Sequence, residues 1–158
     1  MIVIDSCVWI HAFLQTDEKC VRILKRILSE EIKPVVSAYI AKEIVDNVIF
    51  EGCKSGEDIN LLQTAIWSLF REPYVKTTFT PRDFDKIVLR EVKSRAENIA
   101  LAKALRIEPK DAPIVALAHY YAVPLVTMDV KSLLDIKEHI YELIDLDIIT
   151  VDEFLDML

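Results

Sequence analysis

Glycine is almost absent from this sequence. Its two glycines, Gly52 and Gly56, stand within five residues of each other in a chain of 158 residues. Phosphate-cradling motifs, such as the P-loop or the G-x-G-x-x-G turn, need several glycines where a strand meets a helix. The sequence has no such motif, which excludes nucleotide binding by those routes.

Cysteine is also scarce. Cys7, Cys20 and Cys53 are odd in number and form no C-x-x-C pair, so the sequence predicts neither a disulfide framework nor a zinc knuckle. Cys7 and His11 stand four residues apart and could share a helix face. Two such ligands alone rarely form a metal site, and we interpret them as small packed side chains.

Long apolar runs are missing as well, although 53% of the residues are hydrophobic. No uninterrupted run approaches the ~20 residues of a membrane span, and proline interrupts the most apolar stretch, 112–126. Strand-like sequence begins at Ile2, which leaves no room for a signal peptide ahead of it. We expect a cytoplasmic protein, not a membrane protein, with residues 1–158 forming a single domain.

The net charge of −7 argues against strong nonspecific affinity for nucleic acid, which depends on lysine and arginine. The charge is unevenly distributed, however. Residues 76–110 carry nine basic and five acidic side chains, whereas residues 134–158 carry one lysine and eight acidic side chains. One face could therefore meet a polyanion while another repels it.

Two short apolar segments each lead to an aspartate. Residues 2–4 run into Asp5, and residues 124–127 are followed by Asp129. A run that is apolar on both faces is typical of a buried strand in a parallel sheet. The carboxyl ends of parallel strands open on one edge, where α/β proteins bind ligands. Carboxylates that converge there need a cation or a shared proton.

The remaining pattern alternates strands with helices, and it predicts a helix-dominant α/β fold. Further strands are expected at 34–36, 74–79 and 147–151. Helices are expected at 6–14, 18–28, 38–50, 57–70, 112–121 and 132–139, with a long helix starting at Thr80-Pro81 and ending near residue 105. Residues 51–56 are expected to form a loop.

Four carboxylates, Asp5, Glu43, Asp111 and Asp129, are the candidate site residues. Taken singly, each has an ordinary explanation as a turn residue, a helix cap or an exposed helix charge. Taken together, they follow strands or begin helices, so a parallel sheet would place them near one edge. Mg²⁺ or Mn²⁺ prefers such oxygen ligands, and the ion can activate a water and neutralise charge on a phosphodiester.

The order of these motifs resembles the PIN-domain nucleases, including the toxin members of toxin–antitoxin pairs. The resemblance covers nearly the whole chain. It rests on Val3-Ile4-Asp5-Ser6-Cys7-Val8-Trp9-Ile10, Glu43-Ile44, Asp111-Ala112-Pro113-Ile114-Val115-Ala116-Leu117-Ala118, Leu125-Val126-Thr127-Met128-Asp129, and Ile148-Ile149-Thr150-Val151-Asp152-Glu153-Phe154-Leu155.

The resemblance implies a PIN-like three-layer α/β/α fold with a short parallel sheet, and metal-dependent endonucleolytic cleavage of RNA. It matches Asp5, Asp111 and Asp129 to the metal-binding aspartates, and Glu43 to the family's glutamate. Two supporting hydroxyl positions correspond to Ser6 and Thr127. The sequence departs from the family pattern at Lys131, where many members carry a further aspartate, and at Cys7, where serine or threonine is common.

A basic series, Arg82, Lys86, Arg90 and Lys93, has helical spacing and would form one stripe. We consider two interpretations at even weight: a track for RNA phosphates, and a solvated helix face.

The predicted function is a Mg²⁺- or Mn²⁺-dependent endoribonuclease acting through the acidic quartet. The family resemblance adds an antitoxin protein and a homodimer as partners. The alternative is a catalytically inactive PIN-like module that binds RNA or protein, while action on branched DNA and histidine-based catalysis rank lower.

Overall fold

A five-stranded sheet lies at the centre of the computed structural model, which describes residues 1–93 and 95–158, with side chains for 1–91 and 96–158. The strand order is β3-β2-β1-β4-β5, and every neighbouring pair is parallel. The strands are β1 Ile2–Ile4, β2 Pro34–Val36, β3 Lys76–Thr77, β4 Leu125–Val126 and β5 Ile148–Ile149.

The first strand occupies the middle of the sheet. Val3 of β1 is in register with Val35 of β2 on one side and with Leu125 of β4 on the other. All three side chains are fully buried, because helices cover a parallel sheet on both faces. This explains why β1, β2 and β4 are apolar at every position.

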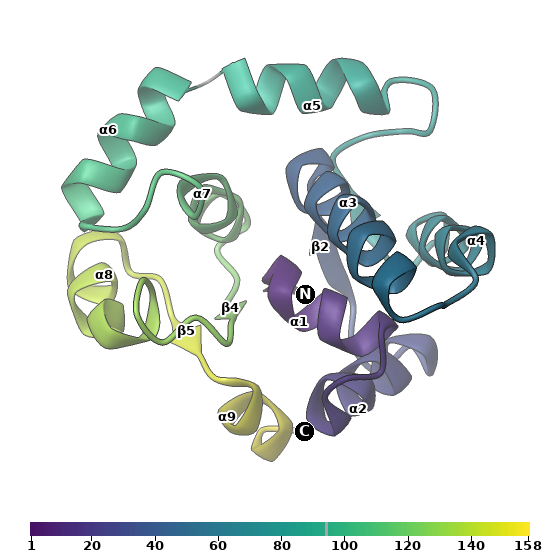
Figure 1. The fold of residues 1–158 in the computed structure, drawn as a ribbon. Helices are drawn as coiled ribbons and strands as arrows, with labels where there is room; N and C mark the ends of the chain where they lie inside the picture. Colours follow the sequence, from purple (N-terminus) through teal and green to yellow (C-terminus); the bar gives the residue numbers. More distant parts are fainter. Residues whose placement is uncertain (94) are drawn as a thin grey trace.

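Helices surround the sheet in a PIN-like α/β/α arrangement, which confirms the predicted fold class (Figure 1). They are α1 Ser6–Phe13, α2 Glu18–Leu28, α3 Ala38–Lys54, α4 Ile59–Phe70, α5 Phe84–Lys93, α6 Arg95–Leu105, α7 Ala112–Tyr121, the 3₁₀ helix η1 Leu134–Ile136, α8 Lys137–Ile144 and α9 Val151–Asp156. No helix within the described residues has both the length and the apolar character required to cross a membrane.

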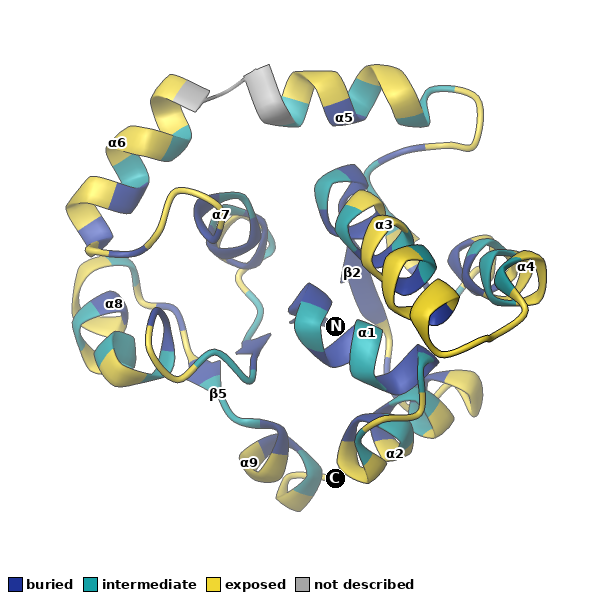
Figure 2. Cartoon of the chain, in the orientation of Figure 1, coloured by how far each residue is buried: buried dark blue, intermediate teal, exposed yellow. Residues whose placement is uncertain are grey.

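The hydrophobic core is one cluster that joins the sheet to these helices. Trp9 is its largest fully buried side chain, stacked on Phe13 with ring centroids 6.0 Å apart and in edge contact with Phe70 at 5.9 Å. The inner faces of α1, α3 and α7 are lined by buried residues, whereas the outer sides of α5 and α6 are largely exposed (Figure 2). The core therefore fixes α1, α3 and α7 relative to the sheet.

The predicted loop at 51–56 is wrong for residues 51–54, since α3 continues to Lys54. Gly52 lies within this helix, and a Cβ there would stand 2.9 Å from Cδ1 of Ile59. This glycine therefore packs directly against the Ile59 side chain at the start of α4. Gly56, with φ of +71°, makes the turn between the two helices.

The predicted helix start at Thr80-Pro81 is also wrong. The side chain of Asp83 accepts a hydrogen bond from the backbone N–H of Thr80 at 2.5 Å and closes a turn instead, so that α5 begins at Phe84. The long helix expected to reach residue 105 is assigned as two helices, α5 and α6, which run in different directions (Figure 1). Residue 94 lies outside the described part.

The helix expected at 132–139 begins later than predicted. The backbone N–H groups of Leu133 and Leu134 both donate to the carbonyl of Asp129, at 3.3 and 3.0 Å. The chain after β4 therefore wraps around Asp129, and η1 and α8 follow at 134–136 and 137–144.

Candidate functional site

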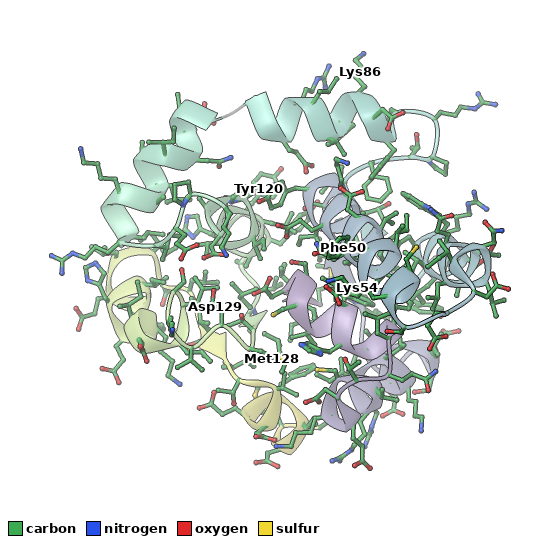
Figure 3. All side chains as sticks on the ribbon, viewed as in Figure 1. Phe50, Lys54, Lys86, Tyr120, Met128 and Asp129 are labelled. Carbon is green, nitrogen blue, oxygen red and sulfur yellow. The ribbon has the colours of Figure 1, made fainter. Side chains whose placement is uncertain are left out.

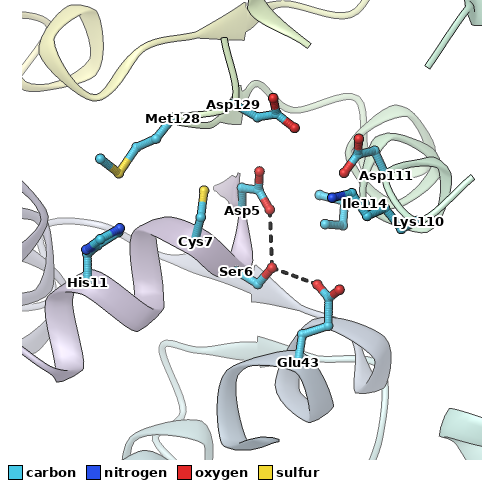
Figure 4. A pocket seen from close by; sticks show the side chains of 10 residues that line it. All are labelled: Asp5, Ser6, Cys7, His11, Glu43, Lys110, Asp111, Ile114, Met128 and Asp129. Atoms are coloured by element: carbon cyan, nitrogen blue, oxygen red, sulfur yellow. Dashed lines mark hydrogen bonds between the residues drawn. The ribbon is translucent and has the colours of Figure 1, made fainter. Parts of the chain in front are cut away.

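A cavity of about 400 Å³ opens at the carboxyl ends of β1 and β4. Figure 4 shows the side chains of Asp5, Glu43, Asp111 and Asp129 around this space. These residues are separated by up to 124 positions in the sequence, and the parallel sheet brings them to one edge. We call this cavity the carboxylate pocket.

Asp5 follows β1 directly and occupies the N-cap position of α1, but its side chain makes no capping hydrogen bond. Its carboxylate instead accepts from the hydroxyl of Thr127 at 2.6 Å. The hydroxyl of Ser6, whose shorter contact is with Glu43, lies 3.3 Å from Oδ1 of Asp5. The side chain of Asp5 is therefore held toward the pocket, although only 5% of this residue is exposed.

Thr127 connects the ends of the two central strands. Its Oγ1 accepts from the backbone N–H of Asp129 at 2.9 Å and donates to Oδ2 of Asp5. Since Thr127 is fully buried, these bonds exchange little with water. They fix the end of β4 relative to the end of β1.

Glu43 approaches the pocket from α3, a helix capped by Ser37 through a bond from the N–H of Ile40. The hydroxyl of Ser6 lies 2.6 Å from Oε2 of Glu43. Burial raises the pKa of Glu43, and the negative charge of Asp5 raises it further, while the bond from Ser6 opposes both effects. Glu43 therefore holds a proton more readily than an ordinary glutamate.

Asp111 stands at the N-cap of α7, again without a side-chain capping bond. The hydroxyl of Ser132 donates to its Oδ2 at 2.6 Å, and the N–H of Ser132 donates to Oδ1 of Asp129 at 3.0 Å. Burial raises the pKa of Asp111, and the charges of Asp129 and Asp5 add to this effect. Ser132 thus bridges two carboxylates that would otherwise repel each other.

The chemistry of this donor set suits a hard divalent cation. Lys110 is the one lysine or arginine among the described residues that line the pocket, and its ammonium is paired with Glu108 at 3.2 Å. The four carboxylates therefore face little positive charge. Within the described part of the chain, no three His, Cys, Asp or Glu side chains stand in a geometry that could hold an ion directly. Mg²⁺ keeps several waters and needs only one or two carboxylates as direct ligands.

Cys7 and His11 of α1 also line the pocket, together with Met128. Burial raises the pKa of the Cys7 thiol well above its ordinary value, and the negative charge of Asp5 raises it further. This thiol stays protonated near neutral pH, which makes it a poor nucleophile. The ring Nδ1 of His11 lies 2.7 Å from Oγ1 of Thr16 and is engaged there.

The predicted basic stripe lies apart from the carboxylate pocket. Arg82, Lys86 and Arg90 are exposed and do not line it. Arg82 precedes α5 instead of lying on it, and Lys86 points away from the body of the protein (Figure 3). The side chain of Lys93 falls outside the described residues. Lys131 is exposed and is not among the residues that line the pocket.

Sequence reasoning missed Ser132 and Lys110 as residues of this site. Both adjoin predicted site residues, since Ser132 stands three positions after Asp129 and Lys110 directly precedes Asp111. A serine three residues after an aspartate can close a turn on its carboxylate. That spacing was the available signal for Ser132, whereas the sequence around Lys110 gives no sign that it faces the pocket.

A scan against protein-family models matches the PIN domain over residues 2–138. The chain belongs to the PIN domain family. This confirms the family predicted from the sequence motifs. PIN domains are generally nucleases, so the family supports a hydrolase activity for this PIN domain.

Solved structures share the fold of this PIN domain. FitAcB from Neisseria gonorrhoeae aligns with a TM-score of 0.56 and 20% sequence identity, covering 96% of this chain and 98% of that chain. FitAB bound to the IR36 DNA fragment aligns with a TM-score of 0.55 and 20% identity, covering 96% and 95%. None of the curated proteins compared with this PIN domain matches it.

Proposed function

We propose that this PIN domain is a metal-dependent endoribonuclease that acts through Asp5, Glu43, Asp111 and Asp129. The observation that carries the proposal is the convergence of these four carboxylates in one pocket at the carboxyl edge of the sheet. Burial first, and then the neighbouring carboxylate charges, raise the pKa values of Glu43 and Asp111. A bound cation would offset both effects.

Asp5, Asp111 and Asp129 would hold Mg²⁺ or Mn²⁺. The bound ion would neutralise charge on the phosphodiester and lower the pKa of an attacking water. Glu43 would bind the ion or orient this water, and its pKa, raised chiefly by burial, makes it a stronger base than an ordinary glutamate. By the family resemblance, the water would attack phosphorus in line with the 3′ oxygen, whose bond to phosphorus breaks, so that the products would carry a 5′-phosphate and a 3′-hydroxyl.

Ser6, Thr127 and Ser132 act as positioning residues in this proposal. Each hydroxyl donates to a carboxylate of the quartet at 2.6 Å. These bonds keep the carboxylates turned toward the pocket while no cation is bound, which lowers the reorganisation needed when an ion arrives.

The RNA would pass over the pocket, with the basic side chains of the α5 region contacting more distant phosphates. Arg82, Lys86 and Arg90 are exposed, as this role requires, and Lys93 is included by its helical spacing. Replacing Lys86 and Arg90 by glutamine should weaken RNA binding and reduce its salt dependence. An unchanged salt slope would favour the solvated-face interpretation.

The test of the proposed function is cleavage of single-stranded RNA by Asp5→Asn. We expect at least a 100-fold loss of rate with Mn²⁺, and circular dichroism should show an intact fold. The matched control is Asp46→Asn, because Asp46 is exposed on α3 and paired with Lys42. Wild-type cleavage by Asp5→Asn would refute the role of Asp5, and absence of cleavage by the wild-type protein would refute the nuclease proposal.

One observation favours the second candidate function, an inactive module that binds RNA or protein. No described set of three or more acidic, His or Cys side chains is arranged to hold an ion directly. Thermal unfolding with millimolar Mn²⁺ separates the two functions. A functional carboxylate site should gain stability when it binds the ion, whereas an inactive module should not.

We further propose the partners and setting that the family resemblance implies. The protein would act as the toxin of a toxin–antitoxin pair, and a small antitoxin protein would cover the carboxylate pocket. It would form a homodimer and be located in the cytoplasm. Exposed apolar side chains, including Tyr120 and Leu143, offer surface for such interfaces. Residues 1–158 would act as one domain, because one hydrophobic cluster spans them.

A further inference from the structure

A second cavity, also of about 400 Å³, adjoins the carboxylate pocket. Tyr39 at the start of α3, Pro109 and Lys110 in the loop before α7, and Pro113 in α7 form its inner wall. Ile99 of α6 stands at its rim, where 54% of this residue is exposed. We call this cavity the side pocket.

The two cavities share a wall. Lys110 lines both of them, and the hydroxyl of Tyr39 donates to the carbonyl oxygen of Lys110 at 2.8 Å. Burial raises the pKa of the Tyr39 phenol, and the charges of Glu43 and Asp111 raise it further. The phenol of Tyr39 therefore stands close to the carboxylates and stays protonated.

The position of Tyr39 is held by its backbone. Its N–H donates to Oε2 of Glu91 at 2.6 Å, and the hydroxyl of Thr78 donates to Oε1 of the same carboxylate at 3.0 Å. Glu91 belongs to α5, so these bonds tie α5 to the start of α3. The aromatic wall of the side pocket is thus organised before any ligand enters.

The lining of the side pocket suits a flat heteroaromatic ring. Tyr39 contributes an aromatic ring, and Ile99, Pro109 and Pro113 contribute apolar surface. Glu91 and Lys110 are charged residues of the same lining, and the carboxylate of Glu91 accepts the two hydrogen bonds from Tyr39 and Thr78. The amide of Asn98, also in the lining, can both donate and accept a hydrogen bond at the edge of such a ring. Aromatic side chains bind single-stranded nucleic acid by stacking on its bases, and the cavity volume falls in the usual range for ligand sites.

We infer that the side pocket binds the base of the nucleotide next to the scissile phosphate, with the base stacked on Tyr39. The inference rests on the proposed function, because cleavage puts a phosphate in the carboxylate pocket and its neighbouring base within reach of the shared wall. A base can enter only when it is unpaired. The substrate would therefore be single-stranded at the cut, and Tyr39 and Asn98 would influence which base is preferred there.

The test compares two oligoribonucleotides of the same sequence, after the cut has been mapped. One is intact, and the other has abasic ribose on either side of the cut. Affinity is measured by fluorescence anisotropy on Asp5→Asn protein, which keeps the strand uncut. We expect the abasic strand to bind about 10-fold more weakly, a typical effect of one stacked base. Adding Tyr39→Leu should weaken binding of the intact strand to the same extent and change binding of the abasic strand little.

Two further variants serve as controls. Tyr39→Phe keeps the ring and should bind the intact strand as the Tyr39 protein does. Tyr120→Leu removes an aromatic ring that is 80% exposed on α7 and outside both pockets, and it should change neither affinity. Equal binding of both strands, or an equal loss for both with Tyr39→Leu, would overturn the inference. The proposed function fails separately, if wild-type protein with Mn²⁺ cuts neither strand.

Discussion

Replacing Asp111 by asparagine should stabilise the protein when no divalent cation is present. The side chain of Asp111 makes no capping bond that asparagine would lose, and the side-chain oxygen of asparagine can still accept from Ser132. The substitution therefore removes the charge with little change of shape. The pKa of Asp111 is raised in spite of the bond from Ser132, so the buried charge has a net cost.

The pH dependence gives the sign of this effect. A carboxyl group with a raised pKa binds more protons in the folded state than in the unfolded chain. The folded protein therefore keeps its full stability at pH values below the ordinary pKa of aspartate. It loses stability as the pH rises toward the higher pKa that Asp111 has in the folded state. The advantage of Asp111→Asn should be largest near pH 7.5 and should shrink as the pH falls to about 4.

The expected result is a higher metal-free Tm for Asp111→Asn than for the wild type, and each 1 kcal/mol of stabilisation corresponds to about 2–4 °C in a domain of this size. Mn²⁺ should reverse the order of the two proteins. At 100 times its Kd the ion adds about 2.7 kcal/mol to the wild type, or roughly 5–11 °C. Asp111→Asn should gain less than half of this.

The assay is thermal unfolding by circular dichroism at both pH values, with chelator or with Mn²⁺. Asp46→Asn removes an exposed charge and should follow the wild type in every condition. A lower metal-free Tm for Asp111→Asn at both pH values would mean that the carboxylate has a structural role through Ser132. Equal stabilisation of both proteins by Mn²⁺ would exclude Asp111 from the metal site.

Three further predictions concern the residues around the quartet. Thr127→Val should lower the free energy of unfolding in urea by about 1–3 kcal/mol, because the N–H of Asp129 loses its acceptor. Thr127→Ser should cost clearly less, and equal losses would contradict the hydrogen-bond explanation. Ser132→Ala should weaken Mn²⁺ binding in calorimetry, whereas Ser55→Ala, in an exposed turn, should not; similar affinities for both would exclude a positioning role for Ser132. Mn²⁺ affinity should fall between pH 7.5 and 5, because protons compete for Glu43 and Asp111, and a pH-independent affinity would contradict their role as ligands.

Several features of the fold could be predicted from local sequence. Residues 2–4 and 125–126 are apolar at every position, which is typical of a strand covered on both faces. Asp111 and Ala112 were recognisable as a helix start. Residues 51–54 and 80–83 were not predictable in the same way, because their structure depends on packing of Gly52 against α4 and on a turn closed by Asp83.

The sequence by itself indicated the short apolar strands and the carboxylates that follow them, because the apolar pattern of a buried strand is local. The alternation of strands with helices then favoured parallel pairing. Tertiary structure alone decided which hydroxyl holds each carboxylate, that Lys110 and Tyr39 form a wall between two cavities, and that Lys86 points away from both. These contacts join residues as far apart as Asp5 and Thr127. They depend on how loops and helices pack after the sheet has formed, and no local pattern in the chain encodes such distances.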